Sequence, residues 1–381
     1  MKESKHILFL VSSMEGGGSE RVTALLCNYW TRNGYQVTLM PTYSGKGDLA
    51  YPIDTRVNVT YLADLLGSKK NNLWNRLKRF LLLRKYIIKN KPDLIISFLT
   101  QVNVISILSS IGTGIPIIVS ERTYPPNYQI GFLWTKLRKI TYPIATAVVM
   151  QTNQGLDWIN KECPKGKNHV IPNPILYPVP TGNPIIEPES IVKKERNICL
   201  AVGRLDKDKR FSEIINAFSC LAEEFSNWDL IILGNGEERL TLEKQIKLKG
   251  LVNRVYLPGR AGNIDSWYQR ANLFIMYSRC EGFPNALLEA MAYGIPCISS
   301  DCDTGPREII VSEENGILLA KNETIDNLAK SMMICMRNKN LADKFGKSAS
   351  KVRDKFSINS VGLQWNDLIN KFLTNPKNPE P

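Results

Sequence analysis

Two cations stand close together after an apolar run that is expected to form a buried strand over residues 197–202. Gly203, Arg204 and Leu205 follow that run, and Lys209 comes five residues after Arg204. An arginine can engage two oxygens of one anion in a fork, and a lysine adds a point charge. At the carboxyl end of a strand this pair suits a diphosphate, and the alternative is a solvated basic loop.

A second candidate site runs from Glu281 to Glu289, after an expected strand over residues 273–277. Glu281 lies in the loop before an expected helix that begins at Pro284. Glu289 lies inside that helix among apolar residues, where a carboxylate needs a partner. The backbone amides of Gly282–Asn285 stand at the helix start, where N–H groups attract anions. Such a segment can hold sugar hydroxyls and a phosphate together, and helix capping alone explains Glu281 but not Glu289.

A third candidate is the glycine run Gly16-Gly17-Gly18, between an expected strand over residues 6–12 and an expected helix over residues 19–33. Glycines let a backbone approach an anion closely, and the helix start supplies N–H groups and a positive dipole. The run does not match G-x-G-x-x-G, and no acidic residue ends the second strand, so a dinucleotide site is poorly supported. The run predicts either an anion-binding loop or a simple turn.

Short apolar runs alternate with longer helical patterns, which predicts an α/β fold built from parallel strands. The other expected strands cover residues 36–41, 94–98, 115–120, 145–150, 169–171, 229–233, 254–257 and 296–299. The other expected helices cover residues 73–90, 102–111, 133–142, 153–161, 212–225, 237–249 and 284–293.

Residues 172–188 contain six prolines, which interrupt the alternation of strands and helices. Such a segment is typical of a linker. The pattern therefore predicts two doubly wound domains, one over residues 1–180 and one over residues 190–357, that face each other across a cleft. A last helix over residues 358–374 is expected to pack back on the first domain.

The charge is unevenly distributed along the 381 residues, whose formal net charge is +13. Residues 1–180 hold 22 basic and 10 acidic side chains, net +12, and the remainder holds 27 and 26, net +1. This indicates a negatively charged partner for the first domain: nucleic acid, an anionic membrane surface or a phosphorylated substrate. Eight scattered cysteines without a C-x-x-C pair predict reduced thiols in a cytosol. The N-terminal apolar run is too short for a signal peptide, and glycines and a proline interrupt the uncharged stretch 94–120, so neither a leader nor a membrane span is predicted.

These elements, in this order, resemble the retaining glycosyltransferases of family 4, whose GT-B fold has two Rossmann-like domains. Glu281 and Glu289 match the family's E-x7-E motif, and Gly203 through Lys209 match its G-R-L-x-x-x-K stretch. The turn that starts at Gly234 and the segment 171–173 resemble its G-x-G-x turn and P-N hinge. The resemblance runs from residue 6 to about residue 320, and the combination of motifs is specific.

The resemblance implies a role for each motif. Arg204 and Lys209 would hold the donor diphosphate and stabilise the charge of the leaving group, with Gly203 and Gly234 beside them. Glu281 would contact the donor sugar, and Glu289 the ribose hydroxyls. The donor would also meet Gly282, Phe283, Pro284 and Asn285. No side-chain nucleophile is established for such enzymes, so positioning and leaving-group stabilisation carry the reaction.

The first domain would supply the acceptor and phosphate side through Gly17, Gly18, Glu121 and Arg122. Many relatives carry a histidine where this chain has Arg122, so we expect Arg122 to contact a phosphate or a sugar hydroxyl instead. The strings at residues 96–99 and 119–121 resemble bacterial enzymes that extend lipid-diphosphate-linked glycans, N-acetylgalactosaminyltransferases among them.

Residues Leu73 to Ile88 form the strongest amphipathic pattern in the chain. Apolar residues there alternate with Arg76, Lys78, Arg79, Arg84 and Lys85, and Lys69 and Lys70 stand before them. We expect this basic helix, with Lys136, Arg138 and Lys139, to dock on anionic lipid and to capture a lipid-diphosphate acceptor. The alternative is a core-facing stripe with a solvated basic face. Nucleic acid is not expected, because no nucleic-acid-binding signature is present.

The sequence thus predicts a hexosyltransferase of bacterial surface-glycan assembly (O-antigen, capsule or lipid-linked oligosaccharide). It would be a cytoplasmic protein bound peripherally to the inner face of the plasma membrane, and would move GalNAc, GlcNAc or a hexose from a nucleotide sugar, in the first instance UDP-linked. The alternatives are a sugar-nucleotide epimerase of the same fold and a non-catalytic basic nucleotide- or nucleic-acid-binding module. No cofactor is expected, and Asp301-Cys302-Asp303 is interpreted as a loop and not as a metal site.

Overall fold

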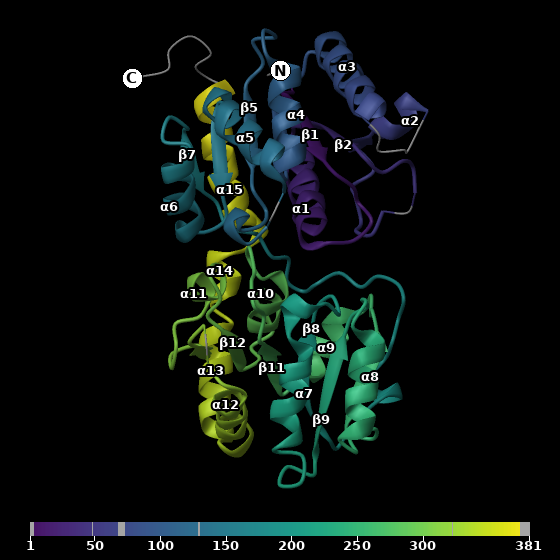
Figure 1. The fold of residues 1–381 in the computed structure, drawn as a ribbon, viewed down its shortest axis with the longest axis vertical. Coiled ribbons are helices and arrows are strands. Elements are labelled where there is room, and N and C mark those ends of the chain that lie inside the picture. The colour runs from purple at the N-terminus through teal and green to yellow at the C-terminus, as the bar shows by residue number, and fades with distance from the viewer. Residues whose placement is uncertain (1–3, 48, 68–72, 129, 322, 374–381) are drawn as a thin grey trace. The chain divides into compact units, whose positions relative to one another are not determined.

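The computed structural model describes residues 4–47, 49–67, 73–128, 130–321 and 323–373. The chain divides into two compact units, which are coloured along the chain in Figure 1. Unit 1 comprises Met1–Pro174 and Ile358–Pro381, and unit 2 comprises Ile175–Ser357. The first crossing between the units therefore falls inside the proline-rich segment, a few residues before the expected limit at residue 180.

Unit 1 contains a seven-stranded parallel sheet in the order β3-β2-β1-β4-β5-β6-β7. Its strands are β1 (His6–Val11), β2 (Gln36–Pro41), β3 (Asn58–Val59), β4 (Leu94–Phe98), β5 (Ile117–Ser120), β6 (Ala147–Met150) and β7 (Asn168–Val170). The chain order reverses between β1 and β4, so a topological switch point lies at the carboxyl ends of these two strands. Ligands of open parallel sheets bind at such a point.

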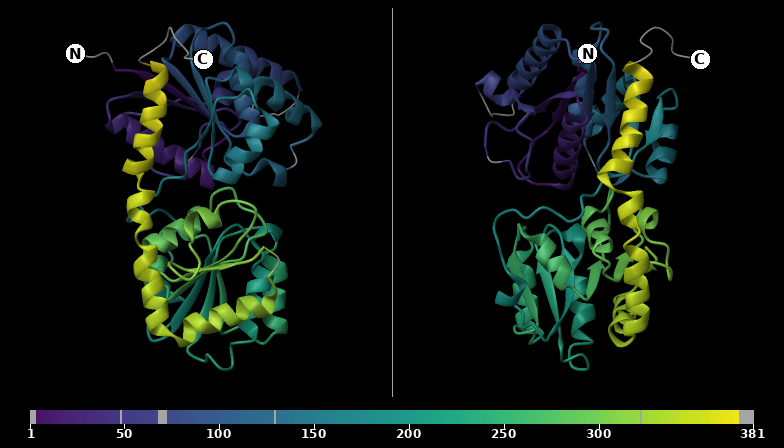
Figure 2. Two further views of the ribbon diagram at one scale, coloured as in Figure 1. Left: turned by 90° about the vertical axis from the view of Figure 1, so that its left-hand side faces the viewer. Right: turned by 180° about the vertical axis from the view of Figure 1, so that it is seen from behind.

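Helices cover both faces of the unit 1 sheet. They are α1 (Gly18–Arg32), α2 (Leu62–Leu66), α3 (Leu73–Asn90), α4 (Thr100–Ser110), α5 (Phe132–Thr141), α6 (Asn153–Glu162) and α15 (Ile358–Leu373). Helices α1 and α15 share one core layer with the sheet, and α2 to α6 share the other. Figure 2 shows α15, in yellow, running beside elements from the start of the chain.

Close packing between α1 and α15 depends on a glycine. A Cβ atom at Gly362 would lie 2.4 Å from Cζ of Tyr29 on α1, so a larger residue would push the helices apart. Trp365 of α15 is fully buried and packs edge-on against Trp30 of α1, with 6.0 Å between the ring centroids. The last described residues of the chain thereby form part of the core of unit 1. Thr374, the predicted last residue of this helix, lies outside the described residues.

Unit 2 contains a six-stranded parallel sheet in the order β10-β9-β8-β11-β12-β13. Its strands are β8 (Asn197–Val202), β9 (Trp228–Leu233), β10 (Val255–Gly259), β11 (Leu273–Met276), β12 (Cys297–Ser300) and β13 (Ile317–Leu319). The order reverses between β8 and β11, which places a second switch point at their carboxyl ends.

The helices of unit 2 are α7 (Phe211–Ser219), α8 (Arg239–Leu248), α9 (Ile264–Arg270), α10 (Asn285–Ala292), α11 (Pro306–Ile309), α12 (Ile325–Arg337), α13 (Lys339–Ala349) and α14 (Val352–Lys355). The 3-10 helices among the described residues are η1 (Pro125–Asn127), η2 (Tyr142–Ile144), η3 (Pro188–Ser190) and η4 (Lys207–Lys209). One core layer joins α7, α8 and α12 to the sheet, and the other joins α9, α10 and α14. The GT-B expectation of two Rossmann-like sheets is confirmed.

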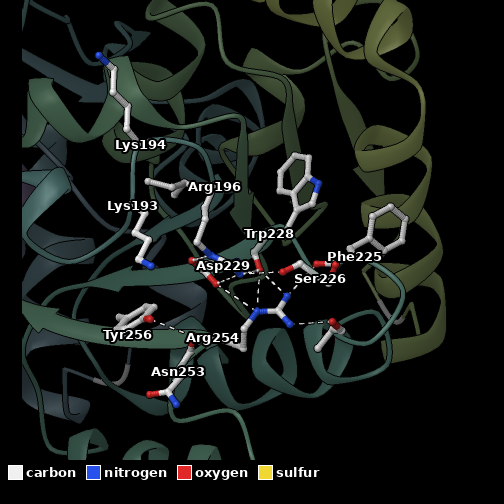
Figure 3. A network of polar contacts seen from close by, with 12 residues as sticks. Lys193, Lys194, Arg196, Phe225, Ser226, Trp228, Asp229, Asn253, Arg254 and Tyr256 are labelled. Atoms are coloured by element: carbon white, nitrogen blue, oxygen red, sulfur yellow. Dashed lines mark hydrogen bonds and ion pairs between the residues drawn. The ribbon is translucent and has the colours of Figure 1, made fainter.

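A buried carboxylate ties the amino end of the unit 2 sheet together (Figure 3). Asp229 of β9 is fully buried and accepts hydrogen bonds from Arg196 (Nε to Oδ2, 2.5 Å) and Arg254 (Nε to Oδ1, 3.2 Å). The same arginines donate to the carbonyls of Ser226 and Phe225. Two guanidinium groups therefore compensate one buried charge and also satisfy loop carbonyls.

Arg254 accounts for a helix that is shorter than predicted. The pattern predicts a helix over residues 212–225, but α7 ends at Ser219 and residues 220–227 form turns. Arg254 donates to the carbonyls of Ala222 and Phe225, which would otherwise need helical partners. Arg254 lies 32 residues after Ala222 and 29 after Phe225, so local periodicity does not reveal it as their partner.

The basic helix α3 presents apolar residues on two opposite faces. Leu83 and Ile87 are fully buried in the core, whereas Trp74 is 63% exposed. Three further apolar residues of the exposed face, at helical spacing from Trp74, are Leu77, Leu81 and Ile88. The core-facing interpretation is therefore wrong for these three residues. Lys69 and Lys70 lie outside the described residues. Within the described part of the chain, no helix has the length and apolarity needed to cross a membrane.

Candidate active site

Glycines allow two loops to pack against each other at the carboxyl edge of the unit 2 sheet. Gly203 donates its N–H to the carbonyl of Leu233 at 3.0 Å, and Leu205 donates to the carbonyl of Asn235 at 3.0 Å. Gly234 has φ +150°, and a Cβ atom there would lie 1.8 Å from the carbonyl oxygen of Gly203. The glycine at this position is thus required by close backbone approach, which brings the loops after β8 and β9 together.

Lys209 and Glu281 form an ion pair beside these loops. Nζ of Lys209 lies 2.5 Å from Oε1 of Glu281, and both side chains are largely buried. Burial by itself lowers the pKa of Lys209, but the charge and hydrogen bond of Glu281 outweigh burial and hold that pKa above its ordinary value. The lysine is therefore a fixed positive charge at neutral pH. The structure brings together one predicted cation and one predicted carboxylate from opposite sides of the switch point.

The turn before Lys209 is held by a residue that sequence reasoning missed. Oδ1 of Asp206 accepts the N–H groups of Asp208 (3.1 Å) and Lys209 (3.2 Å) and so caps η4. The next residue, Arg210, adopts a left-handed backbone with φ +51°, and its guanidinium lies over the ring of Tyr277 at 4.5 Å. An Asp before a K-D-K turn is an ordinary capping signal and could have revealed this role.

The loop that carries Glu281 is held from the neighbouring strand. Thr304, after β12, donates its hydroxyl to the carbonyl of Glu281 at 2.6 Å. Gly305 has φ +98°, and a Cβ atom there would lie 2.7 Å from Cδ of Pro284. No local sequence signal connects residue 304 with residue 281, because only the pairing of β11 with β12 makes them neighbours.

The donor segment 282–289 divides into core residues and backbone groups. Glu289 is almost completely buried and accepts a hydrogen bond from the hydroxyl of Tyr268 at 3.1 Å, which supplies a partner for the carboxylate. The side chain of Phe283 packs in the core against Phe356, with 5.6 Å between centroids, so only its backbone can contact a ligand. Pro284 precedes α10 as its N-cap instead of starting it, and has no N–H to offer.

Arg204, by contrast, extends away from this pair. Its side chain is 74% exposed, and its Nε lies 3.7 Å from Oδ2 of Asp206. An exposed ion pair of this kind contributes little to stability. The arginine is therefore held only loosely and can reorient toward an anion.

In unit 1 the glycine run is closed by the protein's own carboxylate. Glu20 on α1 accepts hydrogen bonds from the hydroxyl of Ser13 and from the N–H of Gly16. Gly17 is the N-cap of α1 and Gly18 its first residue, so Glu20 stands at the third position of the helix. A carboxylate there reaches back to the chain before the helix, as in a capping box. The helix start thus already faces a negative charge.

The placement of Glu121 on the acceptor side is wrong for its side chain. The Glu121 side chain is fully buried, and its carboxylate accepts hydrogen bonds from the hydroxyls of Thr100 (2.8 Å) and Tyr142 (2.5 Å). Nη1 of Arg138 lies 4.0 Å away. Burial raises the pKa of Glu121, and these partners oppose the shift. Glu121 therefore anchors helices α4 and α5 to the end of β5, and both of its carboxylate oxygens are already engaged by protein groups.

The Asp301–Asp303 segment is paired internally. Asp301 forms a two-bond ion pair with Arg307 at 2.8 Å, and Asp303 pairs with Lys321. Across the residues that the structure describes, no group of three or more His, Cys, Asp or Glu side chains could hold a metal ion. Asp301 and Asp303, whose spacing matches an Asp-x-Asp metal motif, therefore already have cationic partners.

Comparison with known proteins agrees with this architecture. Residues 16–175 match the family model described as Glycosyltransferase Family 4, and residues 183–352 match the model described as Glycosyl transferases group 1. Two parallel, doubly wound units of this kind form the GT-B fold, which solved glycosyltransferase structures share. The chain belongs to the family 4 glycosyltransferases, as its motifs predict.

Two curated relatives match nearly the whole chain. A GalNAc-alpha-(1->4)-GalNAc-alpha-(1->3)-diNAcBac-PP-undecaprenol alpha-1,4-N-acetyl-D-galactosaminyltransferase of Campylobacter jejuni is 27% identical over 95% of this chain and 98% of its own. The amylovoran biosynthesis glycosyltransferase AmsD of Erwinia amylovora is 24% identical over 96% and 99%. Among solved structures, HepE of Anabaena in complex with UDP-glucose has a TM-score of 0.76 at 18% identity, covering 96% of this chain and 99% of that one.

Proposed function

We propose that this glycosyltransferase is a retaining enzyme that moves GalNAc, GlcNAc or a hexose from a UDP-sugar to a lipid-diphosphate-linked glycan of a bacterial surface polysaccharide or glycoprotein. The observation that carries the proposal is the buried Lys209–Glu281 ion pair at the switch point of unit 2, beside two close-packed glycine loops. The acceptor named for the C. jejuni relative and the UDP-glucose in the HepE structure support the two substrate classes.

In this proposal the ion pair works as a preorganised charge. Lys209 stabilises the negative charge that grows on the departing diphosphate, and Glu281 fixes the lysine and contacts the donor sugar. Arg204 turns from solvent to the diphosphate when the donor binds, and Glu289 accepts hydrogen bonds from the ribose hydroxyls. The backbone groups of Gly282, Phe283 and Asn285 complete the donor site. The reaction needs no metal, because these cations perform the task that a metal ion performs in other transferases.

The test of this proposal is a screen of UDP-, GDP- and ADP-sugars in EDTA, first for slow donor hydrolysis and then for transfer to lipid-diphosphate glycans. We expect activity with a UDP-sugar, an α-linked product from an α-linked donor by NMR, and no loss of rate in EDTA. An inverted anomer would refute the retaining mechanism. Dependence on a divalent ion would refute the metal-independent site.

The exposed apolar face of unit 1 supports a role in membrane docking. Helices α3, α4 and α5 cover the same face of the sheet. Besides Trp74 and its neighbours on α3, Phe132 on α5 is 84% exposed, and Leu133 and Ile140 of the same helix are exposed too. Lys78, Lys85 and Lys136 are exposed on these helices. Arg79 and Arg138, which were also predicted to contact lipid, are buried, so that part of the prediction is wrong. Apolar side chains interleaved with lysines fit the boundary between lipid head groups and acyl chains. The proposed enzyme therefore occupies a peripheral position on the cytoplasmic face of the membrane.

Membrane docking predicts the outcome of a vesicle assay. Replacing Trp74, Leu77 and Leu81 by Ser should lower the affinity for vesicles that contain phosphatidylglycerol by at least about tenfold, because three exposed apolar side chains no longer leave water. Co-sedimentation of the purified protein measures the change. Raising the salt concentration should weaken binding of the unchanged protein, because the lysine contribution is screened.

The matched control lies in unit 2, where Leu240 and Leu248 of α8 are also strongly exposed. Replacing both by Ser should leave vesicle binding unchanged, because unit 2 is nearly neutral in charge. Equal losses in the two variants would contradict docking through α3.

A further inference from the structure

Arg122 is a buried cation at the carboxyl edge of the unit 1 sheet. It follows β5, is 6% exposed, and uses Nη1 to donate a hydrogen bond to Oδ1 of Asn173 at 2.9 Å. Nε and Nη2 are buried and have no hydrogen-bond partner among the described residues. A buried guanidinium normally satisfies its donors, since each unmet donor keeps its desolvation cost.

Arg122 also lacks a compensating carboxylate. No described acidic side chain forms an ion pair with Arg122, and burial alone lowers the pKa of its guanidinium to about 9. The adjacent Glu121 turns to the other side of the sheet, where it bonds Thr100 and Tyr142 and lies near Arg138. Arg122 therefore remains charged at neutral pH without a counter-charge, and such a group destabilises the ligand-free fold.

The guanidinium is nevertheless held in a defined orientation. It stacks over the ring of Phe98 at 3.6 Å from the centroid and lies 5.7 Å from the centroid of Trp365 on α15. Its partner Asn173 is held in turn by Nε2 of Gln151, which donates to the same Oδ1 at 2.7 Å. Phe98 of β4, Trp365 of α15 and Asn173 thus fix the orientation of a cation that lacks hydrogen-bond partners for two of its N–H groups. If Arg122 had only a structural role, we would expect its N–H groups to donate hydrogen bonds to neighbouring protein oxygens.

The other candidate anion site of unit 1 is occupied from within. The glycine run before α1 already receives the carboxylate of Glu20, so a phosphate there would meet a negative charge. Arg122 offers the opposite charge and has donors to spare. A phosphate group matches a planar guanidinium in charge and geometry, whereas a sugar hydroxyl would leave the charge uncompensated.

We propose that Arg122 is the phosphate receptor of unit 1 and binds a diphosphate through its unused N–H groups, and that Trp365 and Asn173 are the positioning residues that orient it. This inference rests on the proposed function, which supplies two diphosphates: that of the nucleotide sugar and that of the lipid-linked acceptor. Binding the anion compensates the buried charge and completes the hydrogen bonds of the guanidinium. The destabilising cation of the ligand-free protein then becomes a source of affinity.

The positioning role has its own readout. Replacing Trp365 by Leu should weaken binding of inorganic pyrophosphate, whereas Trp365→Phe should restore most of it, because phenylalanine keeps an aromatic face toward the guanidinium. In Trp365→Leu, the KM for the substrate whose diphosphate binds Arg122 should rise, and kcat should change less. Equal pyrophosphate affinity in the Leu and Phe variants would refute a positioning role for the ring.

The central experiment compares Arg122→Met and Arg122→Gln in a Lys209→Met background, which removes the lysine of the donor site. Both changes should raise the dissociation constant for inorganic pyrophosphate at least about tenfold by calorimetry. Arg122→Met should also raise the Tm of the ligand-free protein by roughly 3 °C, since an uncompensated charge is lost. Arg122→Gln can still donate to Asn173, so it keeps the test valid if the Met variant folds poorly.

The source of the diphosphate follows from two further ligands. Loss of affinity for farnesyl diphosphate alone would assign the lipid acceptor, and loss for UDP alone would assign the donor; either outcome supports the receptor. Unchanged affinity for pyrophosphate in both variants, or a lower Tm of ligand-free Arg122→Gln and Arg122→Met alike, would overturn it. Sugar transfer by the unchanged enzyme is measured separately, so a failure here is distinct from a failure of the proposed function.

Discussion

Replacing Glu281 by Gln is expected to lower kcat for sugar transfer by about 10²- to 10³-fold, the loss typical for one preorganised charge group in an active site. The substitution keeps the shape of the side chain but removes the charge 2.5 Å from Nζ of Lys209. The lysine is then misplaced and the donor sugar loses a contact. Replacing Lys209 by Met should cost as much, and the double variant should lose less than the product of the two, because the residues act as one unit.

The pH dependence supplies a second readout of the same change. Glu281 holds the pKa of Lys209 above its ordinary value, so the ion pair stabilises the fold at pH values below the ordinary lysine pKa and loses this contribution as the pH rises through the raised pKa. In Glu281→Gln only burial and weaker partners remain, and burial lowers the pKa of the lysine. The alkaline limb of the pH–rate profile should therefore move to lower pH.

Glu243→Gln is the matched control. Glu243 also pairs with a cation, Arg239 at 2.9 Å, but both side chains are exposed on α8. Rate and pH profile should stay within about twofold of the unchanged enzyme, since exposed pairs contribute little. If Glu281→Gln changed the rate no more than this control, the assigned site would be wrong.

The second large effect concerns stability. Replacing Asp229 by Ala should lower the free energy of unfolding by about 3–5 kcal/mol, because two arginines lose the buried charge that compensates them. Arg196 and Arg254 both bond this carboxylate, at 2.5 and 3.2 Å. Asp229 lies at the amino end of β9, opposite to the end of the sheet that carries Lys209. Activity per folded molecule should therefore be preserved below the melting temperature.

Urea unfolding followed by circular dichroism measures this loss, and Glu224→Gln is its control. Glu224 pairs with Arg337 at 2.5 Å, but both side chains are about half exposed. That substitution should change the free energy of unfolding by less than about 1 kcal/mol. Similar losses in the two variants would show that burial does not set the strength of the Asp229 network.

The two parallel sheets could be predicted because strands and helices each have a local sequence pattern. Buried parallel strands are short apolar runs, and the helices between them follow a 3.6-residue period. The neighbourhood of Gly203 and Glu281 follows once the family is recognised, whereas the strand order that creates the two switch points is seen only in the structure. Short elements such as β3, β13, α9 and α11 were missed, because they are too short to show a period.

The supporting residues could not be predicted in this way. Thr304 and Tyr268 contact Glu281 and Glu289 only because separate strands and helices meet in space. The end of α7 is set by Arg254, which lies in the turn before β10. Contacts of this kind depend on the packing of elements that are distant in sequence, so the local sequence pattern does not predict them.

The sequence alone identifies the candidate cations Arg204 and Lys209 and the candidate carboxylates Glu281 and Glu289, because residue types and their spacing are local properties. What the sequence leaves open is which way each side chain points. Glu121 and Arg122 are neighbours in the chain, yet the first is bonded on the side of α4 and α5 and the second on the side of α15. Successive residues of an extended chain point to opposite faces of a sheet. Only the tertiary structure decides that Glu121 is enclosed by its partners while Arg122 is left with unused donors.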